Sequence, residues 1–148
     1  MKIQKKYYDN LIKKYKNSRK IAGWGSKSSQ EKRFQILTKY LEKNSKFKLL
    51  DVGCGRGDLL SYIKKKKYKK IIYTGLDLNN NLIKIAKKKH KNKNFIFGDF
   101  INKRIKNYDV IFVSGLLNLK VKNHSSWLRK IIKRGIFKSN KLFIFNIL

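Results

Sequence analysis

The stretch LLDVGCGRGDLL, residues 49–60, decides the fold class of this chain. An apolar run ends near Asp51, and glycines follow at 53, 55 and 57 before the next apolar run. Glycine lets the backbone adopt turns that other residues avoid and lacks the Cβ that would keep a ligand at a distance. A helix that starts after such a loop offers free N–H groups. The stretch therefore predicts a ligand-binding turn between a strand and a helix.

The spacing of these glycines narrows the class of ligand. A dinucleotide-binding fingerprint, G-x-G-x-x-G, would place its third glycine at 58, where the chain has Asp58. A phosphate-binding P-loop would continue with G-K-[ST], which does not follow here. A carboxylate at position 58 would repel a pyrophosphate but not a cationic amino group. The pattern G-x-G-x-G therefore disfavours both nucleotide classes.

Strand and helix patterns alternate along the rest of the chain. Runs rich in apolar and β-forming residues predict strands at 47–52, 70–78, 94–100, 108–117 and 141–148. Amphipathic runs predict helices at 2–16, 28–42, 59–68, 79–90 and 123–135. Ser28 with Glu31 predicts a capping box for the second helix, and Gly135 predicts a C-terminal cap for the last. We expect N-terminal helices over residues 1–45 and an α/β core with a doubly wound parallel sheet over 46–148.

The charge of the chain makes its few acids informative. It has 39 Lys and Arg against 8 Asp and Glu, a net charge of +31. Such a charge attracts polyanions. However, Lys, Asn, Ile, Tyr and Phe are all abundant and Pro is absent, as is typical of proteins encoded by AT-rich genomes. We favour this compositional explanation of the charge. Four acids lie at or just after the end of an apolar run that predicts a strand, where open α/β sheets bind ligands: Asp51, Asp58, Asp77 and Asp99. Asp109 starts a strand and should lie at the opposite end.

D-V-G-C-G-R-G at 51–57 resembles motif I of class I S-adenosylmethionine-dependent methyltransferases. YTGLDLN at 73–79, FIFGDF at 95–100 and DVIFVSG at 109–115 resemble the next three strands of that family, and the match spans about residues 23–148. The resemblance is to small bacterial and phage members. It implies a Rossmann-like sheet of order 3-2-1-4-5, S-adenosylmethionine as cofactor, and methyl transfer to an N, O or S acceptor.

The resemblance also implies roles for individual residues. Asp77 would hold the ribose hydroxyls, Asp99 would accept from the adenine amino group, and Phe100 would pack on the adenine ring. Ser114 and Gly115 would line the methyl-donor side. GWGSKSSQEKRF at 23–34 resembles a segment that lies over the cofactor in some members. The full set of cofactor-binding candidates is Trp24, Ser26, Gln30, Asp51, Gly53, Cys54, Gly55, Gly57, Asp77, Leu78, Asp99, Phe100, Ser114 and Gly115. No catalytic base can be named, and no residue spacing suits a metal.

The family's sheet usually has seven strands, and the sequence ends in or just after the fifth, so the last two are missing. A fifth strand left at the sheet edge invites pairing. Three explanations stay open: a fragment or natural truncation, a homodimer paired through this edge, or a trimmed enzyme whose acceptor pocket comes from the N-terminal helices. The alternative function is a truncated, non-catalytic module that binds nucleic acid.

Partners and location follow from simpler observations. The chain has one cysteine, Cys54, no apolar run of membrane-spanning length and no apolar segment after its basic N-terminus. These features predict a cytoplasmic protein without a membrane partner. We expect a small-molecule methyl acceptor, with RNA or another polyanion as the alternative.

Overall fold

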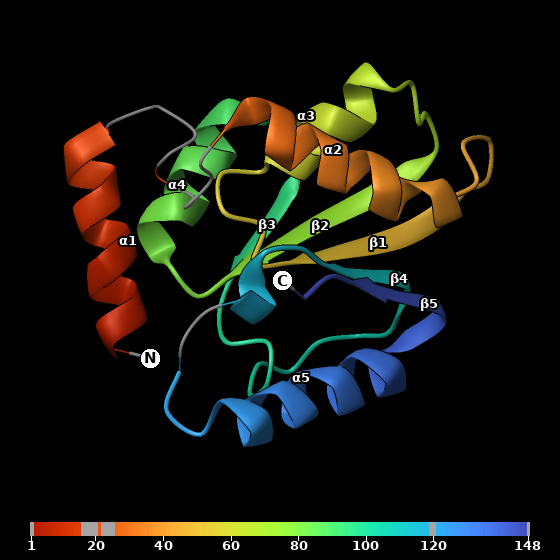
Figure 1. Cartoon of the computed structure of the whole chain (residues 1–148). Helices are drawn as coiled ribbons and strands as arrows, with labels where there is room; N and C mark the ends of the chain where they lie inside the picture. Colours follow the sequence, from red (N-terminus) through yellow and green to blue (C-terminus); the bar gives the residue numbers. More distant parts are fainter. Residues whose placement is uncertain (1, 16–20, 22–25, 119–120, 148) are drawn as a thin grey trace.

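The computed structural model describes residues 2–15, 21, 26–118 and 121–147. Within them a parallel five-stranded sheet has the order β3-β2-β1-β4-β5, as predicted (Figure 1). The strands are β1 Phe47–Val52, β2 Ile71–Asp77, β3 Asn94–Phe97, β4 Tyr108–Val113 and β5 Ser139–Phe145. The helices are α1 Lys2–Tyr15, α2 Lys27–Leu37, α3 Asp58–Lys65, α4 Asn80–Lys89 and α5 His124–Lys138, with 3-10 turns η2 Thr38–Tyr40 and η3 Leu116–Asn118.

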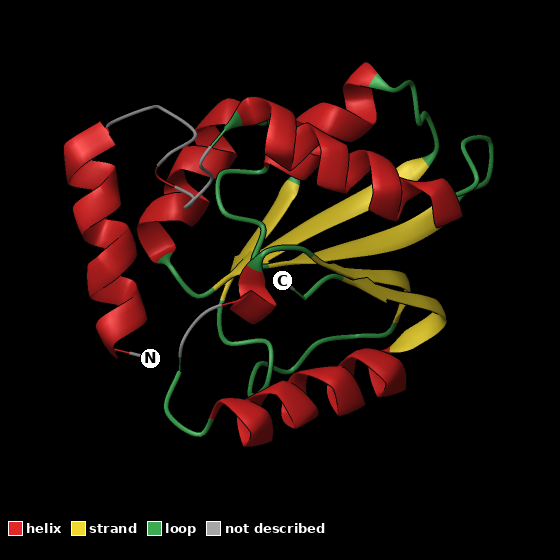
Figure 2. Ribbon diagram, viewed as in Figure 1, coloured by secondary structure: helices red, strands yellow, loops and turns green. Residues whose placement is uncertain are grey.

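Helices cover both faces of the sheet (Figure 2). Leu49 of β1 packs in a core with α2, α3 and α4, whereas its neighbour Leu50 packs in a second core with α5. Both leucines are fully buried. Because both faces of a central strand are covered, its sequence reads as a continuous apolar run. None of the helices in the described residues is long and apolar enough to cross a membrane.

Parallel pairing brings the carboxyl ends of the strands to one edge of the sheet. Val52 at the end of β1 pairs with Leu76 of β2 and with Val113 of β4. Asp77 at the end of β2 pairs with Phe97 of β3. Residues that follow these strand ends are therefore neighbours in space, although they lie far apart in the sequence.

The predicted start of α2 is wrong by two residues. Ser26, in extended conformation, is the N-cap, and its Oγ accepts a hydrogen bond from the Ser29 N–H at 3.1 Å. Ser28 lies inside the helix. The helix also ends early, at Leu37, where the Thr38 hydroxyl donates to the Phe34 carbonyl at 2.6 Å and the chain tightens into η2. Competition of this kind from threonine hydroxyls favours helix ends.

The predicted cap at Gly135 is also wrong, because α5 continues to Lys138. Gly135 is buried against β5, and a Cβ there would lie 2.4 Å from Cε2 of Phe143. The glycine is thus required by close helix–strand packing and not by the end of the helix.

Candidate functional site

A cleft of about 680 Å³ opens at the carboxyl ends of the central strands. Most of the predicted site residues line it: Gln30, Asp51, Gly53, Cys54, Gly55, Asp77, Leu78, Asp99, Phe100, Ser114 and Gly115. Ser26 and Gly57 are not among the described residues that line the cleft, and Trp24 lies outside the described part of the chain. The topology therefore brings four strand ends and the α2 helix around one cavity.

Asp77, at the end of β2, is bonded to the glycine loop. Its Oδ2 accepts from the Gly55 N–H and its Oδ1 from the Asn79 N–H, both at 2.8 Å. Gly55 reaches this position with φ +54°, a conformation that glycine adopts readily. Burial raises the pKa of Asp77 above its ordinary value, and hydrogen bonds from the backbone N–H groups of Asn79, Gly55 and Leu78 act in the opposite direction. A carboxylate has about four acceptor positions on its two oxygens, so Asp77 can also accept from a ligand.

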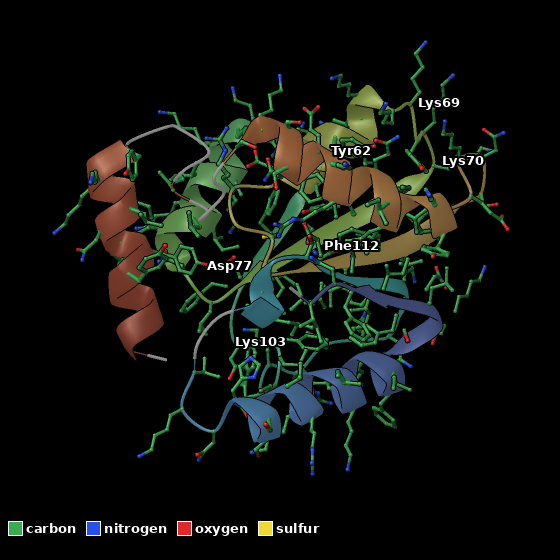
Figure 3. The ribbon with its side chains drawn as sticks, viewed as in Figure 1. Tyr62, Lys69, Lys70, Asp77, Lys103 and Phe112 are labelled. Atoms are coloured by element: carbon green, nitrogen blue, oxygen red, sulfur yellow. The ribbon has the colours of Figure 1, made fainter. Side chains whose placement is uncertain are left out.

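Asp77 does not cap the helix that follows it. Asn79 is the N-cap of α4, and its Oδ1 accepts from the N–H groups of Asn81 and Leu82 at 2.9 and 3.1 Å. This leaves the Asp77 carboxylate facing the cleft (Figure 3).

Asp51 is buried beneath the glycine loop at the end of β1. The Tyr73 hydroxyl donates to its Oδ2 at 2.6 Å. Burial raises the pKa of Asp51 from 3.8 to about 7, although the bond from Tyr73 acts in the opposite direction. The carboxyl group is therefore poised to change its charge when a cation approaches.

Asp58, at the start of α3, links α2, α4 and the glycine loop. Its Oδ1 accepts from Lys89 of α4 at 2.6 Å and from Arg56 of the loop at 3.0 Å, and its Oδ2 accepts from Gln30 of α2 at 3.3 Å. Burial acts to raise the pKa of Asp58, but these donors hold it below its ordinary value. Gln30 is buried at this contact. Asp58 thus fixes α2 and the loop at the cleft.

Gly57 serves the packing of the loop. It is the N-cap of α3 with φ +76°, and a Cβ there would lie 2.8 Å from Cδ2 of His90. The His90 ring lies 2.9 Å from the Gly57 carbonyl oxygen and stacks on Phe95. Cys54 packs in the same region, and burial raises the pKa of its thiol well above the ordinary value. It is therefore a buried loop residue, and its raised pKa favours the neutral thiol over the nucleophilic thiolate.

Asp99 and Phe100 lie at the cleft but also stabilise their own loop. Asp99 Oδ1 accepts from the Ile101 N–H at 3.0 Å, and Oδ2 accepts from the Asn102 side chain at 2.7 Å. These two bonds stabilise the turn that follows β3. Phe100 is buried in the core beside α5, with the Arg134 guanidinium 5.7 Å from its ring centroid.

Ser114 and Gly115 follow β4 on the other side of the cleft. The Ser114 Oγ is buried and has no hydrogen-bond partner among the described residues. The Gly115 N–H donates to the Asn146 side chain at 3.2 Å. Because a buried hydroxyl without a partner is unfavourable, its position at a cleft is typical of a ligand contact.

Sequence reasoning did not place several lining residues. These are Tyr7 and Tyr8 of α1, Arg33 of α2, and Lys122, Trp127 and Lys130 near or in α5. The apolar spacing in α1 indicated a buried face but not which part of the molecule would cover it. Trp127 is half-buried and lies at the cleft. Asp109 lies at the opposite end of the sheet, where it accepts from the Lys48 N–H at 2.7 Å.

Comparison with known proteins agrees with this geometry. Residues 43–146 match the family described as a methyltransferase domain. The chain belongs to this family. A comparison with curated protein sequences gave no match. Within the described residues, no group of three or more His, Cys, Asp or Glu side chains could hold a metal ion.

Solved structures show the same fold at low sequence identity. The N-methyltransferase NodS from Bradyrhizobium japonicum, crystallised with S-adenosylhomocysteine, has a TM-score of 0.69 at 18% identity, over 93% of this chain and 71% of NodS. PH0226 from Pyrococcus horikoshii has a TM-score of 0.68 at 21% identity, over 95% of this chain and 64% of PH0226. The plantazolicin methyltransferase BpumL, crystallised with a pentazolic desmethyl plantazolicin analogue and S-adenosylhomocysteine, has a TM-score of 0.57 at 25% identity, over 95% of this chain and 51% of BpumL.

This chain therefore spans between half and three quarters of the length of these structures. S-adenosylmethionine is the cofactor of the family, and S-adenosylhomocysteine is what it becomes after losing its methyl group.

Proposed function

We propose that this chain binds S-adenosylmethionine in the cleft and transfers its methyl group to an N, O or S acceptor. The observation that carries the proposal is the geometry of Asp77. The glycine loop orients its carboxylate through the Gly55 N–H, and Asp77 lines the cleft, where its oxygens can accept from a ligand. Two adjacent ribose hydroxyls are the donors that such a carboxylate accepts best.

The remaining residues fit the other parts of this cofactor. Asp51 offers a buried carboxyl group to the amino group, since a cation stabilises its charged form. Asp99 and Phe100 lie at the cleft beyond β3, where a carboxylate and an aromatic ring suit adenine. The unpaired Ser114 hydroxyl lies after β4, on the side that we assign to the methyl donor.

The bound cofactor would supply a methyl group on a positively charged sulfur, so that the acceptor's lone pair forms the new bond to carbon while the carbon–sulfur bond breaks. The chain's own contribution is to hold the two reactants in line. The bond between Gln30 and Asp58 fixes α2 at the rim, and Leu116 packs against Gly53 within the loop. These contacts define the space in which an acceptor can lie.

We propose a small molecule as the acceptor. The described residues that line the cleft include four aspartates, Asp51, Asp58, Asp77 and Asp99, and three cations, Arg33, Lys122 and Lys130. A chain with a net charge of +31 therefore carries most of its positive charge elsewhere. This distribution does not favour a polyanion inside the cleft, although it leaves RNA binding on the outer surface as the alternative to be tested.

Calorimetric titration with S-adenosylmethionine tests the proposal. We expect one binding site per chain, and binding at least about 30-fold weaker for Asp77→Asn, because the amide keeps one acceptor oxygen in place of two. Asp109→Asn is the matched control: it changes the same residue type at the opposite end of the sheet and should leave the affinity unchanged.

Two results would count against the proposal. One is the absence of binding heat for the wild-type chain. The other is an equal loss for Asp77→Asn and Asp109→Asn. Retention of RNA that weakens steeply with salt and persists in Asp77→Asn, together with no binding of S-adenosylmethionine, would instead favour the nucleic-acid-binding module.

We also propose that the chain pairs with a second copy through β5. This strand lies at one edge of the sheet, next to β4. Apolar side chains are exposed on and near it: Ile136, Phe137, Leu142, Phe145 and Ile147. Pairing would satisfy the free backbone groups of the edge and cover part of this apolar surface.

A further inference from the structure

The N-terminal helix α1 lies beside α4 and reaches the cleft (Figure 1). Tyr7 and Tyr8 supply this contact, with their ring centroids 5.2 Å apart and the rings edge to face. Neither tyrosine belongs to the two hydrophobic core clusters that pack on the sheet, so packing of the core does not account for their position.

An aspartate of α1 anchors the helix to the start of α4. Asp9 Oδ1 accepts from the side-chain Nδ2 atoms of Asn79 and Asn81, both at 3.0 Å. Asn79 is the residue whose backbone N–H donates to Asp77, and its own Oδ1 caps α4. The contact that positions α1 is thus made to the same residue that orients Asp77.

Tyr8 and Asp77 both line the cleft, and α1 is held to the residues after Asp77 by the bond from Asn79 to Asp9. The Tyr8 side chain is half-buried, and burial together with the nearby Asp77 carboxylate raises the pKa of Tyr8 to about 12. The phenol therefore stays protonated at neutral pH and can donate a hydrogen bond. No residue in the described part of the chain receives a hydrogen bond from it. A half-buried donor beside a ligand-binding carboxylate is available to the ligand.

From this arrangement we infer that Tyr8 is a cofactor-binding residue and that α1, anchored by Asp9, forms the wall of the site on the ribose side. The inference rests on the proposed function, because it names a further residue of the same site. It predicts that α1 and the cofactor stabilise each other. A ligand that fills the space between Tyr8 and Asp77 gains the ring contact, and α1 loses freedom to move when that space is filled.

Titrations of the full chain with two probes test the inference. S-adenosylhomocysteine carries both the nucleoside and the amino acid part, whereas 5′-methylthioadenosine lacks the amino acid part. We expect Tyr8→Ala to weaken both probes by about the same factor, on the order of tenfold, because Tyr8 faces the ribose that they share. Tyr8→Phe, which removes only the hydroxyl, should weaken both about threefold.

Asn10→Ala is the matched control on the same helix, since Asn10 is exposed and does not line the cleft. It should leave the affinity for both probes unchanged. Circular dichroism of each variant shows whether the fold is kept. Tyr8→Phe keeps the ring, so it tests the hydroxyl contact even if Tyr8→Ala proves unstable.

Hydrogen exchange supplies a second measurement, because a ligand would not change the exchange rate of the α1 amides if α1 only packed against the core. S-adenosylhomocysteine should slow exchange of the α1 amides in the wild type and in Asn10→Ala, and this protection should be lost in Asp9→Ala. If the wild type binds the probe but Tyr8 variants bind equally well and α1 amides are unaffected, the inference is overturned while the proposed function stands. If the wild type binds neither probe, the proposed function itself fails.

Discussion

The carboxyl group of Asp51 lies buried beneath the glycine loop, where a change of pH can alter its charge. Burial raises its pKa from 3.8 to about 7. The folded protein thus holds this proton more tightly than the unfolded chain does. The stability that Asp51 contributes is complete below about pH 4 and is lost as the pH rises through about 7. A ligand ammonium group would favour the carboxylate and lower the pKa of Asp51.

We therefore predict that S-adenosylhomocysteine binds more tightly as the pH rises from about 6 to about 8, by roughly threefold to tenfold, and that binding near the lower pH releases a proton. Calorimetry in two buffers with different ionisation enthalpies measures both effects. Asp51→Asn should remove the pH dependence. The probe 5′-methylthioadenosine, which has no amino group, should show little of it in the wild type. Equal pH dependence for both probes would contradict the assignment of Asp51 to the amino group.

At the residue scale, the sequence predicted the acidic residues that line the cleft better than the aromatic residues that line it. Asp51, Asp77 and Asp99 could be predicted because each follows a strand, and parallel strands end at one edge of the sheet. Tyr8 could not, because its position depends on how α1 lies against α4. The two bonds of Asp9 to α4 span about half of the chain and leave no local pattern.

The packing of α5 on β5 depends on the absence of a side chain at Gly135. A Cβ there would lie 2.4 Å from the Phe143 ring. We predict that Gly135→Ala lowers the free energy of unfolding by about 1–3 kcal/mol, because an added methyl group forces the ring or the helix to shift. Urea denaturation followed by circular dichroism measures the change.

The double variant Gly135→Ala with Phe143→Leu is the control for this prediction, since a smaller side chain at 143 makes room for the methyl group. Its free energy of unfolding should be higher than the value expected from adding the losses of the two single variants. If Gly135→Ala is as stable as the wild type, or more stable, then helix propensity outweighs the close contact and the packing explanation is wrong.

At the element scale, helix and strand positions could be predicted but several ends could not. The apolar periodicity of α4 and the β-forming run of β2 are local properties, and both elements formed close to the expected ranges. The start of α2 was misplaced because two serines, Ser26 and Ser28, can both act as N-caps, and only the fold decides between them. The end of α5 was misplaced because a glycine can serve packing as well as capping.

The β5 edge of the sheet is where we propose that two copies of the whole molecule associate. Leu142 and Phe145 of β5 are 39% and 36% exposed. We predict a monomer–dimer equilibrium in sedimentation experiments that shifts toward dimer as salt is raised, because salt screens the repulsion between two chains of net charge +31. Leu142→Lys should shift the equilibrium to monomer, because a charge on the edge opposes strand pairing.

Ile72→Lys is the matched control for this edge, since Ile72 is exposed on β2, which has neighbours on both sides. It should leave the dimer unchanged. A wild-type chain that stays monomeric at every concentration and salt level, or a Leu142→Lys variant that still dimerises, would contradict pairing through β5.

At the scale of the whole molecule, the strand order followed from the alternation of strands and helices together with the resemblance at residues 51–57. The distribution of charge over the folded molecule could not be predicted, because lysines occur along the entire sequence. Only the folded chain shows that cations such as Lys69 and Lys70 lie far from Asp77 (Figure 3). The full lining of the cleft is likewise absent from local patterns, because residues of α1, α2 and α5 join those at the strand ends.

A crystal structure of the full chain with S-adenosylhomocysteine tests the central claim most directly. Our account predicts the ligand in the cleft, with both ribose hydroxyls bonded to the Asp77 carboxylate, adenine near Asp99 and the amino group toward Asp51. A ligand bound with its ribose away from Asp77, or a cleft that stays empty at saturating ligand concentration, would contradict it.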